Sequence, residues 1–332
     1  MRAVVYAHPG NVDVIELREV ADPECGDDEV LVDVAYTGLN RADLLERRGL
    51  YGPPEASSGP TIPGLEYAGI VTRVGKAVLR FAPQDRVFGI AAGRAHAERI
   101  AVHEGTAMHV PEALDLEKAA AIPEAFMTAW DALFRAGHFR LGMTVIVHAA
   151  GSGVALAALA LAKTAGGFSI GTSRSSEKLE RAAAHGMDYG ARLDEDWPAI
   201  AKRVTQGRGA DVVLDFLGPS AFDRNVAALA AGGRIVQIGT LGGASGSVSF
   251  GTLMAKRGSL IGTVLRGRPL GEKIALTRAF EAEIVPLFGR GMLKPTIDRV
   301  FPFHEIRDAH RYMEENRNFG KVVLKVHENG EV

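Results

Sequence analysis

The sequence predicts an α/β protein in which a β-rich region is combined with a doubly wound parallel sheet. Over the first 120 residues, segments of β-branched residues alternate with turns rich in Gly, Pro and Asp. Past Pro111, short apolar runs alternate with segments of helical periodicity. That second pattern is typical of a parallel sheet with helices on both faces.

Five segments of the β-rich region are expected to be strands: MRAVVYA, DVIELREV, EVLVDVAYTGL, AGIVTRVG and AERIAVH. The proline-rich segment 51–64 is predicted to be a loop. Helical spacing then covers 111–137, with five small side chains on one side: Ala121, Ala125, Thr128, Ala129 and Ala132.

In the second region, strands are expected at 144–148, 168–173, 211–218, 233–243 and 258–265, and helices at 153–165, 176–185 and about 221–231. Two further helical patterns, 273–290 and 304–316, precede a final strand, GKVVLKV. This strand resembles the N-terminal ones and is expected to return to the first domain. We therefore expect one domain over 1–122 and 273–332, and a second over 123–272.

Composition excludes several classes of protein. The 332 residues, 47% of them hydrophobic, suffice for two domains with cores. No apolar run approaches the roughly 18 residues of a membrane span, and the N-terminus does not resemble a signal peptide. A single cysteine, Cys25, excludes an internal disulfide and fits a reduced cytoplasmic location. The net charge of −2 indicates neither a nucleic-acid nor a membrane partner.

A nucleotide-binding turn is predicted where strand 144–148 meets helix 153–165. The turn, AAGSGVA, contains Gly151, Ser152, Gly153 and Val154. Glycines there allow a tight turn and let the backbone approach a pyrophosphate at the helix N-terminus. A glycine-rich turn is weak evidence by itself, but the strand before it and the helix after it favour a Rossmann unit.

The end of the following strand indicates which cofactor is bound. An NAD-binding unit carries an acid there for the ribose 2′-hydroxyl. This chain has Ser173 and Arg174, with Lys178 one helical turn later. A hydroxyl and two cations suit a 2′-phosphate, which favours NADPH; the alternative is that both cations are ordinary solvated charges.

Common catalytic groups of nicotinamide enzymes are missing from the sequence. The ten histidines show no His-x-x-x-His or Cys/His grouping, and no tyrosine is followed by lysine four positions later. We expect no metal site, and we interpret His148 as a packed structural residue.

Four segments resemble the zinc-free quinone oxidoreductases, the zeta-crystallin-like branch of the medium-chain dehydrogenases/reductases: VAYTGLNRADLLERRGLYGPP, IPGLEYAGIVTRVG, AAAIPEAFMTAWDAL and NRNFGKVVL. The resemblance covers essentially the whole chain and is closest to the subgroup induced by a tumour suppressor. It implies a GroES-like catalytic domain beside the Rossmann domain. Zinc-dependent members carry cysteine where this chain has Asn40 and histidine where it has Leu65, and Glu66 alone cannot hold zinc.

The resemblance also implies roles for individual residues. Asn40 and Tyr51 are assigned to the nicotinamide ribose and the quinone, and Glu66 and Thr128 to the surroundings of the nicotinamide. Asp43 either orients the loop or forms a hydrogen bond in the cleft, or it is the N-cap of the helix DLLERRG. Further cofactor contacts are expected at Gly218, Ile238, Gly239, Leu241, Leu265, Arg266 and Asn318.

One departure from the family concerns the 2′-phosphate. Many relatives have a tyrosine there, where this chain has Leu193 beside Arg192. Either Arg192 replaces the contact that the tyrosine makes with the 2′-phosphate, or the preference for NADPH over NADH is weaker than the family resemblance implies.

Three functions remain open. The first is an NADPH-dependent quinone oxidoreductase. A quinone accepts hydride readily, so positioning and a polarised oxygen suffice, and solvent or a bound water supplies the proton. The second is a reductase of activated C=C bonds in enones or enoyl thioesters. The third is an NADPH-binding structural or sensor protein with little turnover. The apolar late strand SLIGTVL is expected to pair across a two-fold axis in a homodimer; the alternative is a central or covered strand in a monomer.

Overall fold

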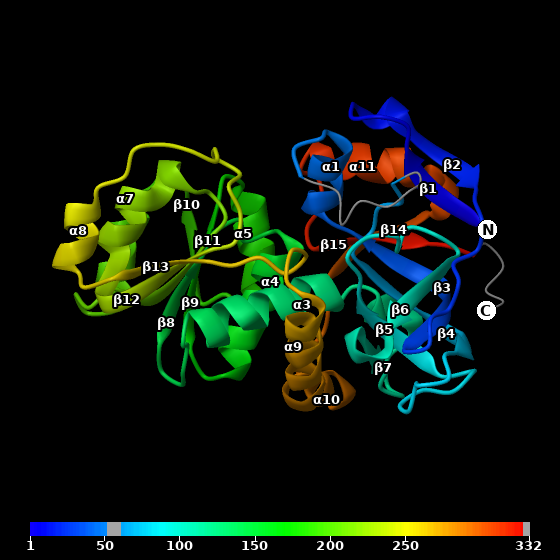
Figure 1. Cartoon of the computed structure of the whole chain (residues 1–332). Helices are drawn as coiled ribbons and strands as arrows, with labels where there is room; N and C mark the ends of the chain where they lie inside the picture. The colour runs from blue at the N-terminus through cyan, green and yellow to red at the C-terminus, as the bar shows by residue number, and fades with distance from the viewer. Residues whose placement is uncertain (52–60, 328–332) are drawn as a thin grey trace. The chain divides into compact units, whose positions relative to one another are not determined.

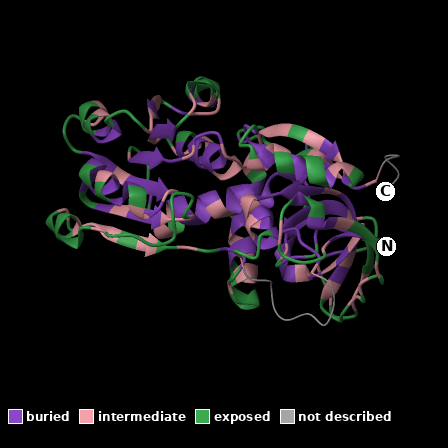
Figure 2. Cartoon of the chain, turned by 90° about the horizontal axis from the view of Figure 1, so that it is seen from above, coloured by how far each residue is buried: buried purple, intermediate pink, exposed green. Residues whose placement is uncertain are grey.

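The computed structural model describes residues 1–51 and 61–327, which form two compact units (Figure 1). Unit 1 contains Met1–Met127 and the chain from Leu265 onward, and unit 2 is the continuous segment Thr128–Val264. Figure 2 shows buried residues concentrated on the strands and exposed residues on the outer helices and loops. The predicted α/β class is confirmed.

Unit 1 is built around a sheet with the strand order β14-β15-β3-β4-β5-β7, in which β6 also pairs with β3, while β1 pairs with β2 separately. Its strands are β1 (Arg2–Tyr6), β2 (Ile15–Glu19), β3 (Glu29–Leu39), β4 (Glu66–Val74), β5 (Arg86–Ile90), β6 (Arg99–His103), β7 (Ala107–His109), β14 (Ile297–Pro302) and β15 (Lys321–Lys325). The predicted return of the last strand is confirmed, because β15 pairs antiparallel with β3 and parallel with β14.

The helices of unit 1 are α1 (Arg41–Arg47), α2 (Leu116–Ala119), the first part of α3 (Pro123–Trp130, which crosses the unit boundary), α9 (Leu270–Glu283), α10 (Val285–Gly289) and α11 (Ile306–Glu314). Short 3₁₀ turns lie at η1 (Val12–Val14), η2 (Glu104–Thr106) and η4 (Phe303–Glu305). The core packs strand residues such as Val32, Tyr67 and Leu324 against Ile306 and Met313 of α11. In Figure 1, α1 and α11 lie side by side.

Unit 2 is a six-stranded parallel sheet with the order β10-β9-β8-β11-β12-β13. Its elements are β8 (Thr144–Val147), α4 (Gly153–Thr164), β9 (Phe168–Ser173), α5 (Ser176–Ala183), β10 (Tyr189–Arg192), α6 (Trp197–Val204), β11 (Ala210–Asp215), α7 (Pro219–Ala228), β12 (Leu229–Gln237), α8 (Phe250–Ala255) and β13 (Ser259–Gly262). Numbered within the unit, this is the Rossmann order 3-2-1-4-5-6, which reverses between β8 and β11. Ligands bind beyond the carboxyl ends of the strands at such a reversal.

Three predicted helices have different limits in the structure. The pattern over 111–137 divides into α2, α3 and a π-helical segment, η3 (Asp131–Ala136). The helix expected to reach 231 ends at Ala228, and the next strand continues through Gly232, whose φ of +78° is not helical. The pattern over 273–290 is interrupted at Ile284, because Pro286 has no N–H for a continuous helix.

Candidate functional site

The first part of the candidate site is the turn between β8 and α4 in unit 2. Ser152 is the N-cap of α4, and its Oγ accepts the N–H of Ala155 at 3.2 Å. Ala149 has a φ of +55°, which gives the turn its sharp bend. The side chain of Lys178 lies directly over Gly151, with its Cδ 2.7 Å from where a Cβ on that glycine would stand.

These features fit the pyrophosphate of a dinucleotide. The N-terminus of the twelve-residue helix α4 presents unpaired N–H groups and the positive end of the helix dipole. Gly151 and Gly153 bring no side chain into the turn, and Lys178 adds a cationic side chain above it. Val154, in the first turn of α4, is half-buried.

The second part of the site lies at the end of β9. Ser173 is buried, and its Oγ accepts the N–H of Ser175, the N-cap of α5. Arg174 is exposed, and within residues 1–51 and 61–327 its guanidinium has no hydrogen-bond or ion-pair partner. An unpaired guanidinium at this place suits a doubly charged phosphate better than a neutral hydroxyl.

Arg192, at the end of the neighbouring strand β10, is held differently. Its guanidinium binds both carboxylate oxygens of Asp194, at 2.9 and 2.8 Å, and contacts Ser176 Oγ at 3.3 Å. A phosphate would therefore compete with Asp194 for this group. Leu193 is half-buried and uses its carbonyl to accept a hydrogen bond from Arg224.

The loops after β11 and β12 contain the remaining predicted contacts in unit 2. Gly218 has a φ of +83°, and Asp215 Oδ1 accepts its N–H. The N–H of Ile238 binds the carbonyl of Asp215, so the two strand ends are joined. Gly239 is half-buried and Leu241 is 57% exposed.

His148 lies beneath these loops. It is fully buried between the Thr172 hydroxyl, at 2.6 Å, and Asn225 Oδ1, at 2.7 Å, and Asn225 Nδ2 donates to Asp215. Burial lowers the pKa of His148, so a neutral imidazole joins the ends of three strands. The interpretation of His148 as a packed structural residue is confirmed.

In unit 1, a buried ionic cluster is centred on Glu66 at the start of β4. Its Oε1 accepts hydrogen bonds from Asn40 Nδ2, at 2.9 Å, and from the ammonium of Lys321. Its Oε2 accepts the main-chain N–H of Glu124 at 2.8 Å. Lys321 also donates to Asn40 Oδ1 at 2.6 Å and to the carbonyl of Leu39 at 3.2 Å. The Glu66 carboxylate is therefore paired and fully bonded, as a buried charge must be.

Asn40, rather than Asp43, is the N-cap of α1. The helix begins at Arg41, and Asp43 is its third residue, where Oδ2 accepts the Asn40 N–H at 2.7 Å in a capping box. The alternative of Asp43 as N-cap is therefore wrong, because Asn40 precedes it in extended conformation and serves the same purpose.

The buried polar side-chain atoms of unit 1 that have no hydrogen-bond partner among residues 1–51 and 61–327 include Asp43 Oδ1, Glu46 Oε2, His96 Nδ1, Arg266 NH1 and His310 Nε2. Burial raises the pKa of Asp43 to about 7 and lowers that of His96 to about 4. An unsatisfied buried polar group costs about 1–3 kcal/mol, so we expect internal water molecules in this region.

Tyr51 and Arg266 form the edge of this region. The guanidinium of Arg266 lies 5.1 Å from the centre of the Tyr51 ring, donates to Glu46 Oε1 at 2.8 Å and to the carbonyl of Ala92 at 3.1 Å. Burial raises the pKa of Tyr51. Tyr51 is half-buried, with its ring against a cation.

The structure brings together Asn40, Asp43 and Glu66 in unit 1, and places Tyr51 and Arg266 in contact there. Leu265 and Asn318 are buried in the same unit, and Asn318 Nδ2 donates to the carbonyl of Gly320. Thr128 is half-buried in α3 and belongs to unit 2. The phosphate-turn residues form their own group in unit 2.

Sequence reasoning missed four members of the unit 1 cluster: Glu46, His96, Glu124 and Lys321. Glu46 could have been found, since it is a charged residue in a short helix that must bury one face. Lys321 gives no local signal, because its partner lies 255 positions away in the chain.

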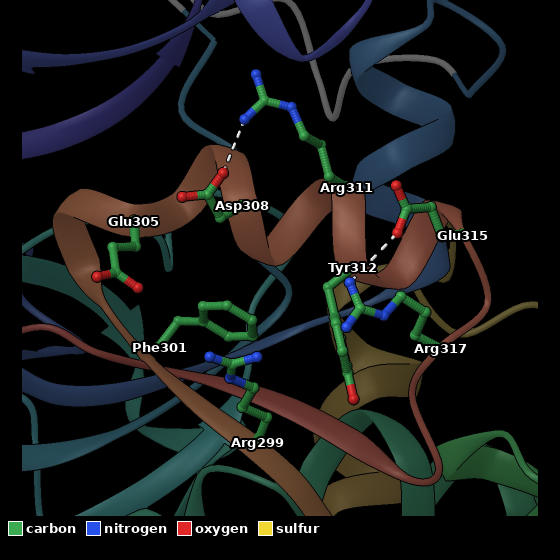
Figure 3. Close-up of a pocket in the computed structure, with 8 residues that line it drawn as sticks. All are labelled: Arg299, Phe301, Glu305, Asp308, Arg311, Tyr312, Glu315 and Arg317. Atoms are coloured by element: carbon green, nitrogen blue, oxygen red, sulfur yellow. Dashed lines mark hydrogen bonds and ion pairs between the residues drawn. The ribbon is translucent and has the colours of Figure 1, made fainter.

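A surface recess of about 320 Å³ lies elsewhere on unit 1, between β14 and α11 (Figure 3). Arg311 pairs with Asp308 and Arg317 with Glu315, and Arg299 stacks on Phe301. The recess contains none of the predicted site residues.

Comparison with known proteins agrees with this description. The alcohol dehydrogenase GroES-like domain family matches residues 26–119, and the zinc-binding dehydrogenase family matches residues 182–324. The chain is 32% identical over 348 residues to the synaptic vesicle membrane protein VAT-1 homolog of Rattus norvegicus. This match covers 98% of this chain and 84% of that protein. It is 30% identical over 314 residues to quinone oxidoreductase-like protein 2 of Mus musculus, and the match covers 94% of this chain and 89% of that protein.

Solved structures extend the likeness. An NAD-dependent alcohol dehydrogenase superposes with a TM-score of 0.88 at 34% identity, over 98% of this chain and 100% of that chain. A quinone oxidoreductase of Pseudomonas syringae pv. Tomato DC3000 superposes with a TM-score of 0.89 at 26% identity, over 98% of this chain and 99% of that chain. The CurK enoyl reductase superposes with a TM-score of 0.87 at 27% identity, over 98% of each chain.

A GroES-like unit and a Rossmann unit with a nucleotide-binding turn define an oxidoreductase that uses a nicotinamide cofactor. The chain belongs to the medium-chain dehydrogenase/reductase superfamily. No helix in the described part of the chain is long and apolar enough to cross a membrane.

The matched zinc-binding family raises the question of a metal. At the positions considered above, Asn40 supplies an amide, Leu65 is an apolar buried residue, and both oxygens of Glu66 are already bonded. The ammonium of Lys321 adds a positive charge there. These residues do not fit a zinc ion, which prefers Cys, His and free carboxylates.

Proposed function

We propose that the protein is an NADPH-dependent quinone oxidoreductase that transfers hydride to a quinone without a metal. The observation that carries the NADPH assignment is the end of β9, where Ser173 and the unpaired Arg174 stand in place of an acid. A doubly charged 2′-phosphate would gain charge-assisted hydrogen bonds there, each stronger than a neutral one.

The turn residues Gly151, Ser152, Gly153 and Val154, with Lys178, would hold the pyrophosphate. We assign the adenosine end to Ser173, Arg174, Arg192 and Leu193, and further contacts to Gly218, Ile238, Gly239, Leu241, Leu265, Arg266 and Asn318. When bound, the reduced nicotinamide supplies the hydride.

The residues of unit 1 are proposed to position the acceptor. Asn40 and Tyr51 bind the nicotinamide ribose and the quinone, and Glu66 and Thr128 lie near the nicotinamide. Asp43 fixes the start of α1 through the capping box, so that Asn40 keeps its orientation. The ammonium of Lys321 neutralises Glu66, and the two side chains fix the orientation of the Asn40 amide beside the acceptor oxygen.

The choice of a quinone is supported by the likeness to quinone oxidoreductase-like protein 2 and to the Pseudomonas quinone oxidoreductase. A second candidate is the reduction of an activated C=C bond, which the likeness to the CurK enoyl reductase favours. Both reactions need hydride at an electron-poor carbon or oxygen and a polarised acceptor oxygen.

Steady-state oxidation of NADPH and of NADH, with an ortho-quinone and then with an enone, tests the proposal. We expect NADPH oxidation to be fastest with the quinone. Turnover with the enone alone would instead establish the second candidate. If NADPH binds and neither acceptor is reduced, the protein is a binding or sensor protein, and the proposal is wrong.

Arg174→Ala tests the cofactor assignment. Loss of a charge-assisted bond of about 1.5–3 kcal/mol is expected to raise the KM for NADPH about 10- to 100-fold and to leave the KM for NADH unchanged. The matched control is Arg181→Ala, which removes an exposed arginine from α5. Equal effects of the two variants on NADPH would contradict a role for Arg174.

A further inference from the structure

Glu124 occupies a distinctive place beside the unit 1 cluster. It is the second residue of α3, and its main-chain N–H binds Glu66 Oε2 at 2.8 Å. This bond holds the start of α3 against Asn40, Glu66 and Lys321. Glu124 is half-buried, and its carboxyl group has no hydrogen-bond or ion-pair partner in the described residues.

Charged groups from four other segments influence the pKa of Glu124. Burial and the negative charge of Glu66 raise the pKa of Glu124 to about 8, and Asp43 of α1 adds to this, while Lys321 of β15 and Arg266 oppose it. At neutral pH the carboxyl group therefore carries a proton. The charge of Glu124 in turn contributes to the raised pKa of Tyr51, so the two side chains lie within electrostatic range.

Other acids of the cluster are less suited to give up a proton to a bound molecule. Asp43 is fully buried and accepts the Asn40 N–H. The ammonium of Lys321 donates to three oxygens within the protein. His96 is buried, and its pKa of about 4 leaves it neutral. Glu124, by contrast, carries a proton at neutral pH, is only half-buried, and is held in place by the hydrogen bond from its main-chain N–H to Glu66.

We propose that Glu124 is the proton donor to the acceptor, a role that rests on the proposed function. The acceptor gains a hydride, with its electron pair, from bound NADPH and a proton from the Glu124 carboxyl group. A quinone thereby becomes a hydroquinone, reduced by two electrons, and NADPH is oxidised. The Glu124 carboxylate then takes a proton from solvent, which completes the balance of one hydride and one proton for each acceptor.

Glu124→Gln tests this role, because it keeps the size and the main-chain N–H and removes the acid. General acid catalysis contributes about 10²- to 10⁴-fold, so we expect single-turnover NADPH oxidation by an ortho-quinone at pH 7 to slow about 100-fold. In the wild type the rate should fall tenfold per pH unit above about pH 8, as Glu124 loses its proton. In the variant this fall should disappear.

Two further variants make the result decisive. Glu112→Gln, which changes an exposed carboxylate of unit 1, is the matched control and should keep the wild-type rate and pH profile. Glu124→Asp should react more slowly but keep the fall at alkaline pH, whereas a merely structural role would change NADPH affinity and leave the pH profile intact. NADPH binding is followed by its fluorescence in every variant.

The outcomes separate this role from the proposed function. If the wild type oxidises NADPH and Glu124→Gln keeps its rate and its alkaline fall, Glu124 is not the donor, although the function stands. If the wild type reduces neither quinone nor enone, the proposed function is wrong, and the role of Glu124 falls with it.

Discussion

At the scale of single residues, the buried polar groups of unit 1 determine how stability depends on pH. Asp43 keeps its proton in the folded protein up to a pKa of about 7, against an ordinary value of 3.8. Between these values the unfolded chain has lost a proton that the folded chain retains. The contribution of Asp43 to stability is therefore greatest in acid and is lost as the pH rises towards 7.

We expect Asp43→Asn to remove this dependence. Relative to the wild type, its free energy of unfolding should rise by about 3 kcal/mol between pH 4 and pH 7, because the slope approaches 1.4 kcal/mol per pH unit only between the two pKa values. Urea unfolding at several pH values measures this difference. Asp27→Asn, at an exposed carboxylate, is the control and should stay within about 0.5 kcal/mol of the wild type throughout. A constant difference between Asp43→Asn and the wild type would contradict the assignment.

At the scale of elements, β13 is the last strand in the order of the unit 2 sheet. Leu260 of this strand is 43% exposed, and the neighbouring α8 has no buried residue. An apolar edge strand is a template for pairing with another chain. We propose that it pairs with its copy in a homodimer.

Leu260→Lys is expected to convert this dimer to a monomer, because the substitution places a charge on the pairing edge. Light scattering after size-exclusion chromatography gives the mass directly. Leu79→Lys, at a 91% exposed leucine of unit 1, should leave the mass unchanged. A wild type that is already monomeric would contradict the proposal.

Elements with a local signal were predictable, and contacts between distant segments were not. The β8–α4 unit has an apolar run, a glycine turn and a capping serine in direct succession, and the structure contains each of them. In α1, two capping residues stand three positions apart, and sequence reasoning considered Asp43 as the cap where the structure has Asn40. Glu124 follows a proline at the start of a helix, as acidic residues commonly do at a helix N-terminus. That local pattern gives no indication that Glu124 lies beside Glu66.

At the scale of the whole molecule, unit 2 is one continuous segment with its own core, formed by residues such as Ile146, Ile170, Trp197, Val213 and Ile235. Unit 1 is completed only by residues from both ends of the chain.

We therefore expect the fragment 128–264 to fold alone and to unfold cooperatively on heating, as followed by circular dichroism. The fragment 1–127 should not do so, because it lacks β15, which covers one edge of β3 in the sheet of unit 1. Cooperative unfolding of 1–127, or its absence from 128–264, would contradict this division.

The place of β15 also has a consequence for how the chain is made in the cell. A ribosome adds about 5–20 residues per second, so roughly 10–40 seconds separate the synthesis of residue 128 from that of the last strand. Throughout that interval the edge of β3 that β15 will cover lacks its partner strand. We expect the nascent chain to present a finished unit 2 together with an unfinished unit 1, and to depend on chaperones until Lys321–Lys325 has left the exit tunnel.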